Sequence, residues 1–208
     1  MPGRAVNVNR ACLIALLLGA AVPASGQSRR PIDTANSRVI VRVYKSGLFS
    51  PFAHNHEIEA RIAEGEVDLG NPPSVTLSFQ SARLRVLDPE ASSRTRAEIQ
   101  RTMLGPEVLD VARFPEIRFA SQHVNEAGPD RWRVEGELTL HGMTKPVAFV
   151  VTEAAGVYRG AVLLRQTDFG IRPVRLAGGT IKVKDQVHIE FEIRIANPPA
   201  AAGVGNFH

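Results

Sequence analysis

The sequence has one cysteine, one tryptophan and two tyrosines among its 208 residues. A single cysteine excludes an intramolecular disulfide, and Cys12 lies in an apolar N-terminal run, so the rest of the chain has no thiol for catalysis or for a cysteine-ligated zinc. An excess of one charge is also missing, because 25 basic and 21 acidic side chains give a formal charge of only +4. This excess is too small to predict a nucleic-acid partner. So few tryptophans and tyrosines also argue against an outer-membrane barrel, which needs aromatic girdles.

Long apolar runs are absent except for one near the N-terminus. Arg4 and Arg10 precede the apolar residues 11–22, and the small residues Ala24-Ser25-Gly26 follow, which is the order of a secretory signal peptide. An apolar run of 12 residues is short against the ~20 that a membrane-spanning helix needs. We therefore predict a signal peptide over residues 1–26, cleavage near Gly26-Gln27, a periplasmic or secreted protein, and no stable membrane insertion.

Catalytic motifs are missing as well. The sequence contains no Gly-x-Ser-x-Gly elbow, phosphate-binding Walker loop, dinucleotide fingerprint or His-Glu-x-x-His helix. Its carboxylates, such as Glu135, Glu137, Glu190 and Glu192, occupy alternate positions of predicted strands, as expected of a solvent-facing side. We therefore predict a protein that is not an enzyme and has no cofactor.

What the sequence does contain is apolar residues with a period of two. Val187, Ile189, Phe191 and Ile193 alternate with polar residues, which is typical of a strand with one buried and one solvated face. The same alternation recurs along residues 39–43, 75–79, 117–119, 132–140, 147–151 and 161–163. Turn-forming stretches separate these segments, for example residues 70–73, 127–130, 141–142, 155–156 and 178–179.

One stretch departs from this period. Ile99, Met103 and Leu104 are spaced as on a helix, and Asp88 followed by Pro89 is typical of a helix start. This pattern predicts a short helical insertion near 89–113, with a helix over about 89–104 and further turns over 106–113. The residues 198–208 are rich in Ala, Gly and Pro, and we expect a disordered tail there.

A sheet of about eight antiparallel strands with one apolar face must bury that face away from water. No covering helices are predicted, so the sheet has to close on itself or fold into two layers. The economical solution is an all-β fold, a closed antiparallel eight-stranded barrel over residues 27–197. At this size the interior is filled by side chains or holds one slim ligand.

Several motifs in register also resemble a known family. Residues 114–121, 138–146 and 167–171, together with the opening residues 32–37, are similar to the YceI-like family of lipocalin-like, polyisoprenoid-binding bacterial proteins. The resemblance extends over roughly residues 31–196. It implies a periplasmic lipid-binding protein whose barrel holds a long isoprenoid, such as a polyprenyl phosphate or an isoprenoid quinone, without catalysis.

The candidate binding residues follow from the strand pattern and this resemblance. We expect the barrel interior to be an apolar tunnel lined by Phe49, Phe52, Phe79, Phe119, Leu138, Phe149, Phe169 and Phe191. A phosphorylated headgroup would remain at a mouth of the tunnel, beside the cations of Arg172 and Arg175 or beside His54 and His56. Asp168 and Gly170 are assigned a structural role in a turn, in which Gly170 adopts a positive φ.

His54 and His56 leave a second interpretation open. Residues two positions apart on a strand share one face, so both rings could reach one metal ion. The candidates for a third ligand are Glu57, His141 and His188, and none of them is convincing from the sequence. We therefore predict no metal. The alternatives are a metal- or His-dependent enzyme or factor that uses this pair, and an interaction module whose barrel is filled by its own side chains. The identity of the isoprenoid is left open, as is the oligomeric state, with a homodimer as one option.

Overall fold

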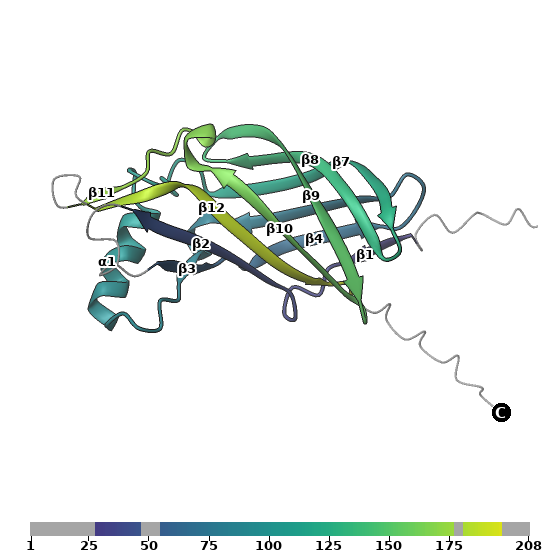
Figure 1. Ribbon diagram of the computed structural model, residues 1–208, viewed down its shortest axis with the longest axis horizontal. Helices are drawn as coiled ribbons and strands as arrows, with labels where there is room; N and C mark the ends of the chain where they lie inside the picture. Colours follow the sequence, from purple (N-terminus) through teal and green to yellow (C-terminus); the bar gives the residue numbers. More distant parts are fainter. Residues whose placement is uncertain (1–27, 47–54, 177–180, 197–208) are drawn as a thin grey trace, which may run out of the picture.

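The computed structural model describes residues 28–46, 55–176 and 181–196 as a curled antiparallel sheet with one α-helix at one end (Figure 1). The strands are β1 (Arg29–Pro31), β2 (Arg38–Ser46), β3 (His56–Glu59), β4 (Ile62–Asp68), β5 (Ser74–Gln80), β6 (Arg85–Val86), β7 (Glu116–Gly128), β8 (Arg131–Leu140), β9 (Met143–Ala154), β10 (Val157–Arg165), β11 (Arg175–Leu176) and β12 (Ile181–Arg194). The helices are η2 (Ser81–Arg83), α1 (Ser93–Leu104) and η3 (Gln166–Phe169), of which η2 and η3 are 3-10 helices.

The strand path differs from the expected closed ring of eight. Its order is β1-β4-β5-β7-β8-β9-β10-β12-β2-β3-β6, with β11 paired to β12 beside the path, so the described sheet has two ends. The short strands β1, β3 and β6 account for the larger number of strands in the path, and no described ladder pairs β4 with β2 to close the other eight strands into a ring. The chain after β1 contacts the end of β12, a strand inside the path: Ile32 forms a bridge with Ile195, and the Asp33 amide donates to the Arg194 carbonyl at 2.8 Å.

The period-two segments of the sequence do form strands, namely β2, β5, β7, β8, β9, β10 and β12. The sequence pattern did not predict β4. A register shift between Ile62 and Glu64 places a bulge in this strand, so its apolar residues Ile62 and Val67 do not keep a spacing of two. Its Gly65 also removes one apolar position.

The helix begins later than predicted. Ser92, and not Asp88, is the N-cap residue, and its hydroxyl accepts the Thr95 amide at 3.1 Å. The segment after the helix forms turns, including a positive φ of 44° at Asp110. Met103 and Leu109 nevertheless bury their side chains, so that α1 and the following turns cover the core at one end of the sheet.

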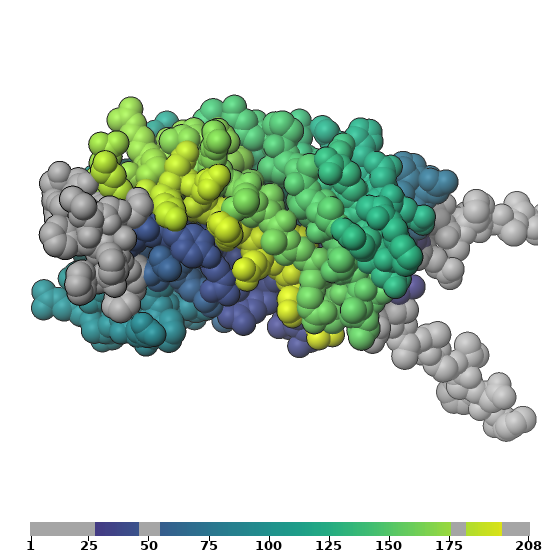
Figure 2. Space-filling view, viewed as in Figure 1, coloured from purple at the N-terminus to yellow at the C-terminus, as the bar shows by residue number. Residues whose placement is uncertain are grey.

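The apolar side chains of alternate residues lie on one face, which we call the inner face of the sheet. The larger buried cluster includes Val39, Ile58, Phe79, Leu84, Val86, Leu164 and Val187, together with Met103 of α1. A second buried cluster consists of Phe119, Val134 and Val151. The strands β2, β12 and β10 lie side by side across the face shown in Figure 2.

Candidate functional site

The inner face carries five of the residues predicted to line a tunnel. Phe79 and Phe119 are buried, whereas Leu138, Phe149 and Phe191 are only partly buried although they pack against the same clusters. The Phe149 ring lies between the other two aromatic rings, with centroid distances of 5.5 Å to Phe119 and 5.4 Å to Phe191. Three strands, β7, β9 and β12, thus place aromatic rings in contact across the interior.

The other three predicted tunnel residues differ from this group. Phe169 lies in η3, is 2% exposed and belongs to the packed core, so it has little surface left for a ligand. Phe49 and Phe52 lie outside the described residues.

Two nitrogen-bearing side chains, Lys45 and His56, also lie on the inner face, at the end where α1 covers the core. Lys45 continues the alternation of Val41 and Val43, and His56 shares a face with Ile58. Burial lowers the pKa of Lys45, and the nearby charge of Asp88 opposes that lowering. An ammonium group here therefore has a cost of desolvation that a bound anion would reduce.

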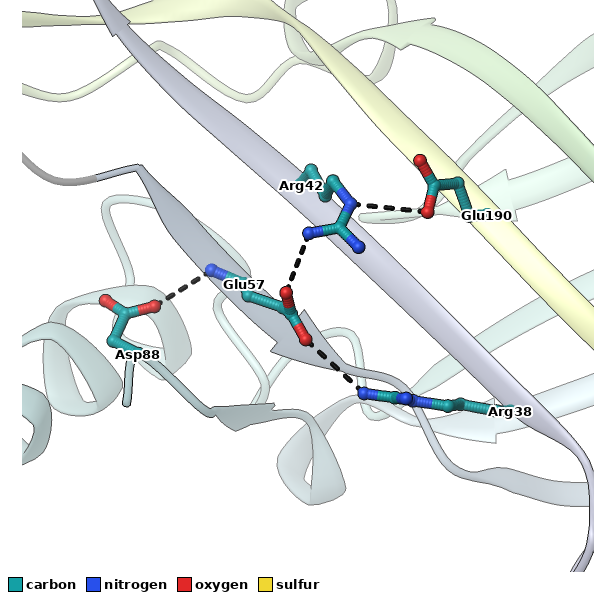
Figure 3. A network of polar contacts seen from close by, with 5 residues as sticks. All are labelled: Arg38, Arg42, Glu57, Asp88 and Glu190. Carbon is teal, nitrogen blue, oxygen red and sulfur yellow. Dashed lines mark hydrogen bonds and ion pairs between the residues drawn. The ribbon is translucent and has the colours of Figure 1, made fainter. Parts of the chain in front are cut away.

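Asp88 connects the segment before α1 to β3 at this end of the sheet. Its side chain is 3% exposed; Oδ2 lies 2.6 Å from His56 Nδ1, and Oδ1 accepts the Glu57 amide at 2.8 Å. On the other face, Glu57 accepts from Arg42 Nη1 at 2.7 Å and from Arg38 Nη2 at 3.4 Å (Figure 3). The segment before α1 is thereby tied to β3, and β3 to β2.

Sequence reasoning assigned Asp88 to the helix cap and missed this role. Leu84, Val86 and Asp88 are all buried and are spaced two apart. A carboxylate that continues a buried alternation requires a partner, because an unpaired buried charge is costly. This spacing was the available indication of a buried polar contact.

Known proteins share both the sequence pattern and the fold of this chain. The family model of the YceI-like domain matches residues 31–195. The chain belongs to the YceI-like family. It is 34% identical over 118 residues to UPF0312 proteins of Pseudomonas savastanoi pv. phaseolicola and Pseudomonas syringae pv. tomato. These alignments include 47% of this chain, which spans only 59% of the length of either relative.

Two solved structures share the YceI-like fold. BcnA of Burkholderia cenocepacia superimposes with a TM-score of 0.61 at 17% identity, over 80% of this chain and 99% of that chain. A polyisoprenoid binding domain from Saccharophagus degradans superimposes with a TM-score of 0.51 at 11% identity, over 82% and 99%. At these identities the likeness establishes the antiparallel all-β fold.

The predicted headgroup residues of this YceI-like protein lie in separate places. Arg172 and Arg175 are exposed, after η3 and in β11, and neither forms an ion pair with a described residue. His56 is paired with Asp88 instead of facing solvent, and His54 lies outside the described residues. The structure does not bring the two arginines into contact with His56.

The turn that precedes Arg172 has a glycine in the predicted conformation, but the carboxylate that accepts its backbone amide is not that of Asp168. Gly170 has a φ of +71°, as predicted. The Thr167 amide donates to Asp185 Oδ1 at 2.9 Å, so the acid that accepts it is Asp185 of β12 and not Asp168. This acceptor joins η3 to β12.

Two further features concern only the described part of the YceI-like chain. Across residues 28–46, 55–176 and 181–196, no three His, Cys, Asp or Glu side chains gather as ligands for a metal ion. Within the same ranges, no helix has the length and apolar character needed to cross a membrane.

A groove of about 660 Å³ lies between α1 and β6. Arg61, Arg83, Arg85 and Arg96 line it, and Arg96 Nη1 donates to the Leu87 carbonyl at 2.9 Å.

Proposed function

We propose that this YceI-like protein is exported and that its curled sheet encloses one long isoprenoid lipid, which it binds without catalysing a reaction. The observation that carries the proposal is the incomplete burial of Leu138, Phe149 and Phe191. These large apolar side chains face inward, yet they are only partly buried. Protein interiors are normally close-packed, so apolar surface left open inside the sheet favours an apolar ligand that covers it.

Two arguments favour a long isoprenoid as the ligand. The domain from Saccharophagus degradans that shares this fold is described as polyisoprenoid binding. The free energy also favours a long chain, because each buried methylene contributes ~0.8 kcal/mol, and twenty of them contribute on the order of 16 kcal/mol before ordering costs. The tail would therefore provide most of the affinity, and the headgroup would provide selectivity.

A phosphorylated headgroup would remain at the α1 end of the sheet. Moving a phosphate into an apolar interior costs several kcal/mol unless its charge is paired. Lys45 on the inner face can pair with such a charge, and β11, which carries Arg175, lies at the same end as α1 (Figure 1). Export and a periplasmic or secreted location rest on the signal-peptide pattern of residues 1–26.

Native mass spectrometry of the protein purified from its natural host tests the proposal. We expect one lipid mass per chain, lost on extraction with organic solvent. A stoichiometric metal ion without lipid would instead favour the metal-dependent alternative that uses His54 and His56. Protein with neither mass would favour an interaction module, and both of these results contradict lipid binding.

The position of the headgroup gives a second test. Replacing both Arg172 and Arg175 by alanine is expected to weaken binding of a polyprenyl phosphate about tenfold or more, as for loss of a charge-assisted hydrogen bond of about 1.4 kcal/mol. Binding of a neutral isoprenoid quinone should change less than about twofold, since it presents no charge to these guanidinium groups. Fluorescence displacement measures both affinities.

The control is Arg131→Ala, which removes an exposed cation from the start of β8. Equal weakening for phosphate and quinone would show that the arginines only shape the loop. No change for either lipid would place the headgroup elsewhere, with Lys45 and His56 as the next residues to test.

A further inference from the structure

One seam of the curled sheet is open along most of its length. The ladder between β9 and β10 pairs only Val157–Gly160 with 151–154, although β9 begins at Met143 and β10 continues to Arg165. On their other sides both strands are paired almost throughout, β9 with β8 and β10 with β12. The two strands spread apart from their hairpin in Figure 1.

Both ends of this opening are closed by specific contacts. At the narrow end, Gly160 pairs with Val151, and a Cβ added at Gly160 would lie only 2.8 Å from the Val150 carbonyl oxygen. At the wide end lies η3, whose Phe169 carbonyl is 3.1 Å from His141 Nδ1. The side chain of Gln166 also donates to the Lys184 carbonyl of β12 at 2.8 Å. We call the gap between these limits the β9–β10 opening.

The lining of the opening joins the outside to the interior. A cavity of about 300 Å³ lies there, bordered by Val147, Val162, Leu164 and Phe169, which belong to the inner core or pack against it. It is also bordered by Leu163, which points to the outer face and is 57% exposed. Apolar surface is therefore present on both sides of the same seam.

Exposed apolar residues concentrate at this seam. The described residues contain three large exposed hydrophobic side chains, Leu69, Met143 and Leu163. Leu163 borders the cavity, and Met143 lies at the wide end, where its Sδ would be 3.2 Å from a Cβ on Gly170. Apolar surface that gathers at one place, unlike single scattered side chains, marks a site of contact with an apolar partner.

Two cations accompany the apolar lining. Lys145 shares the inner face with Val147, and Arg165 lies on the outer face at the end of β10; both border the cavity, together with the single acid Asp168. Neither cation forms an ion pair with a described residue. An anionic group between them would gain two charge-assisted contacts.

We propose that the β9–β10 opening is the route by which the lipid passes sideways into the interior, with its anionic headgroup held by Lys145 and Arg165 during passage. This inference rests on the proposed lipid-binding function and adds a site to it. A sideways route lets a long chain move from an apolar phase to the interior without exposing its whole length to water, which would cost ~0.8 kcal/mol per methylene.

A cross-link across the opening tests the route. Ala148 and Leu163 both point to the outer face and would face each other if the ladder continued past Gly160 and Val151. In a chain carrying Cys12→Ser, the pair Ala148→Cys and Leu163→Cys is oxidised, which holds β9 against β10. A short bis-maleimide reagent serves where the disulfide does not form.

The measurement is transfer of a fluorescent polyprenyl phosphate from phosphatidylcholine vesicles to the protein. We expect the oxidised variant to take up lipid at least about tenfold more slowly than its reduced form, with recovery after reduction, because passage needs the seam open. The control is Thr139→Cys with Thr144→Cys, which joins β8 to β9 where the two hydroxyls already lie 2.8 Å apart. Its oxidation should leave the rate unchanged.

The double variant Lys145→Gln, Arg165→Gln tests whether these two cations hold the anionic headgroup during passage. The transfer rate of polyprenyl phosphate should fall about tenfold, while that of the uncharged polyprenol should change less than about twofold. Equal rates for oxidised and reduced Ala148→Cys, Leu163→Cys protein would overturn the route, and equal falls for both lipids would overturn the headgroup site. A parent protein that takes up neither lipid would contradict the proposed function itself.

Discussion

Replacing Leu138 by arginine is expected to lower the affinity for a polyprenyl lipid by about a hundredfold or more. Leu138 pairs with Phe119 across β7 and β8 on the inner face. A guanidinium group there would have to be desolvated against the lipid without a partner charge, at a cost of several kcal/mol, and about 2.8 kcal/mol already corresponds to a hundredfold loss. Displacement of a hydrophobic fluorescent probe measures the affinity.

The matched control is Glu137→Arg, one residue earlier in β8 on the exposed outer face. It introduces the same side chain without touching the interior, so binding should remain within about twofold of the parent. Circular dichroism establishes whether each variant retains its sheet. A folded Leu138→Arg protein that binds the probe as well as the parent would contradict lipid binding in the interior.

Replacing Asp88 by alanine is expected to lower the free energy of unfolding by about 2–4 kcal/mol. The substitution removes both acceptors of a buried carboxylate and leaves His56 Nδ1 and the Glu57 amide without their partner. Because Glu57 also holds Arg42 and Arg38, the loss should loosen β3 against β2. Equilibrium unfolding in urea measures the change.

Two variants calibrate this result. Asp88→Asn keeps one oxygen for the Glu57 amide and should lose less stability than Asp88→Ala. Asp168→Ala removes an exposed carboxylate and should change the free energy of unfolding by less than about 0.5 kcal/mol. If Asp88→Ala were as stable as the parent, the contacts of Asp88 would not hold this end of the sheet together.

The failure to predict Asp88 shows where sequence reasoning reaches its limit. The cap interpretation used only its neighbours along the chain, Pro89 above all. The partner that decides its role, His56, is 32 residues away and lies on a strand that the sequence pattern did not identify. A contact between distant segments depends on strand order, which local patterns do not contain.

The sequence by itself determined seven strands, namely β2, β5, β7, β8, β9, β10 and β12, and which of their side chains share a face. Alternating residues in β2, β5 and β7 to β10 assign each apolar side chain to one face, because side chains on a strand point alternately to its two sides. The positive φ of Gly170 was predictable for the same local reason. The motifs at residues 114–121, 138–146 and 167–171 also identified the family that the comparison then established.

Only the tertiary structure decided how the strands are joined. The bulge in β4, the extension of the sheet by β3 and β6, and the end of the β9–β10 ladder at Gly160 all depend on the register between neighbouring strands. The alternation of Val147 and Phe149 is the same whether or not β10 lies beside them. Register is set by packing across the whole curled sheet, and for that reason the open seam and the buried Asp88 became visible only in three dimensions.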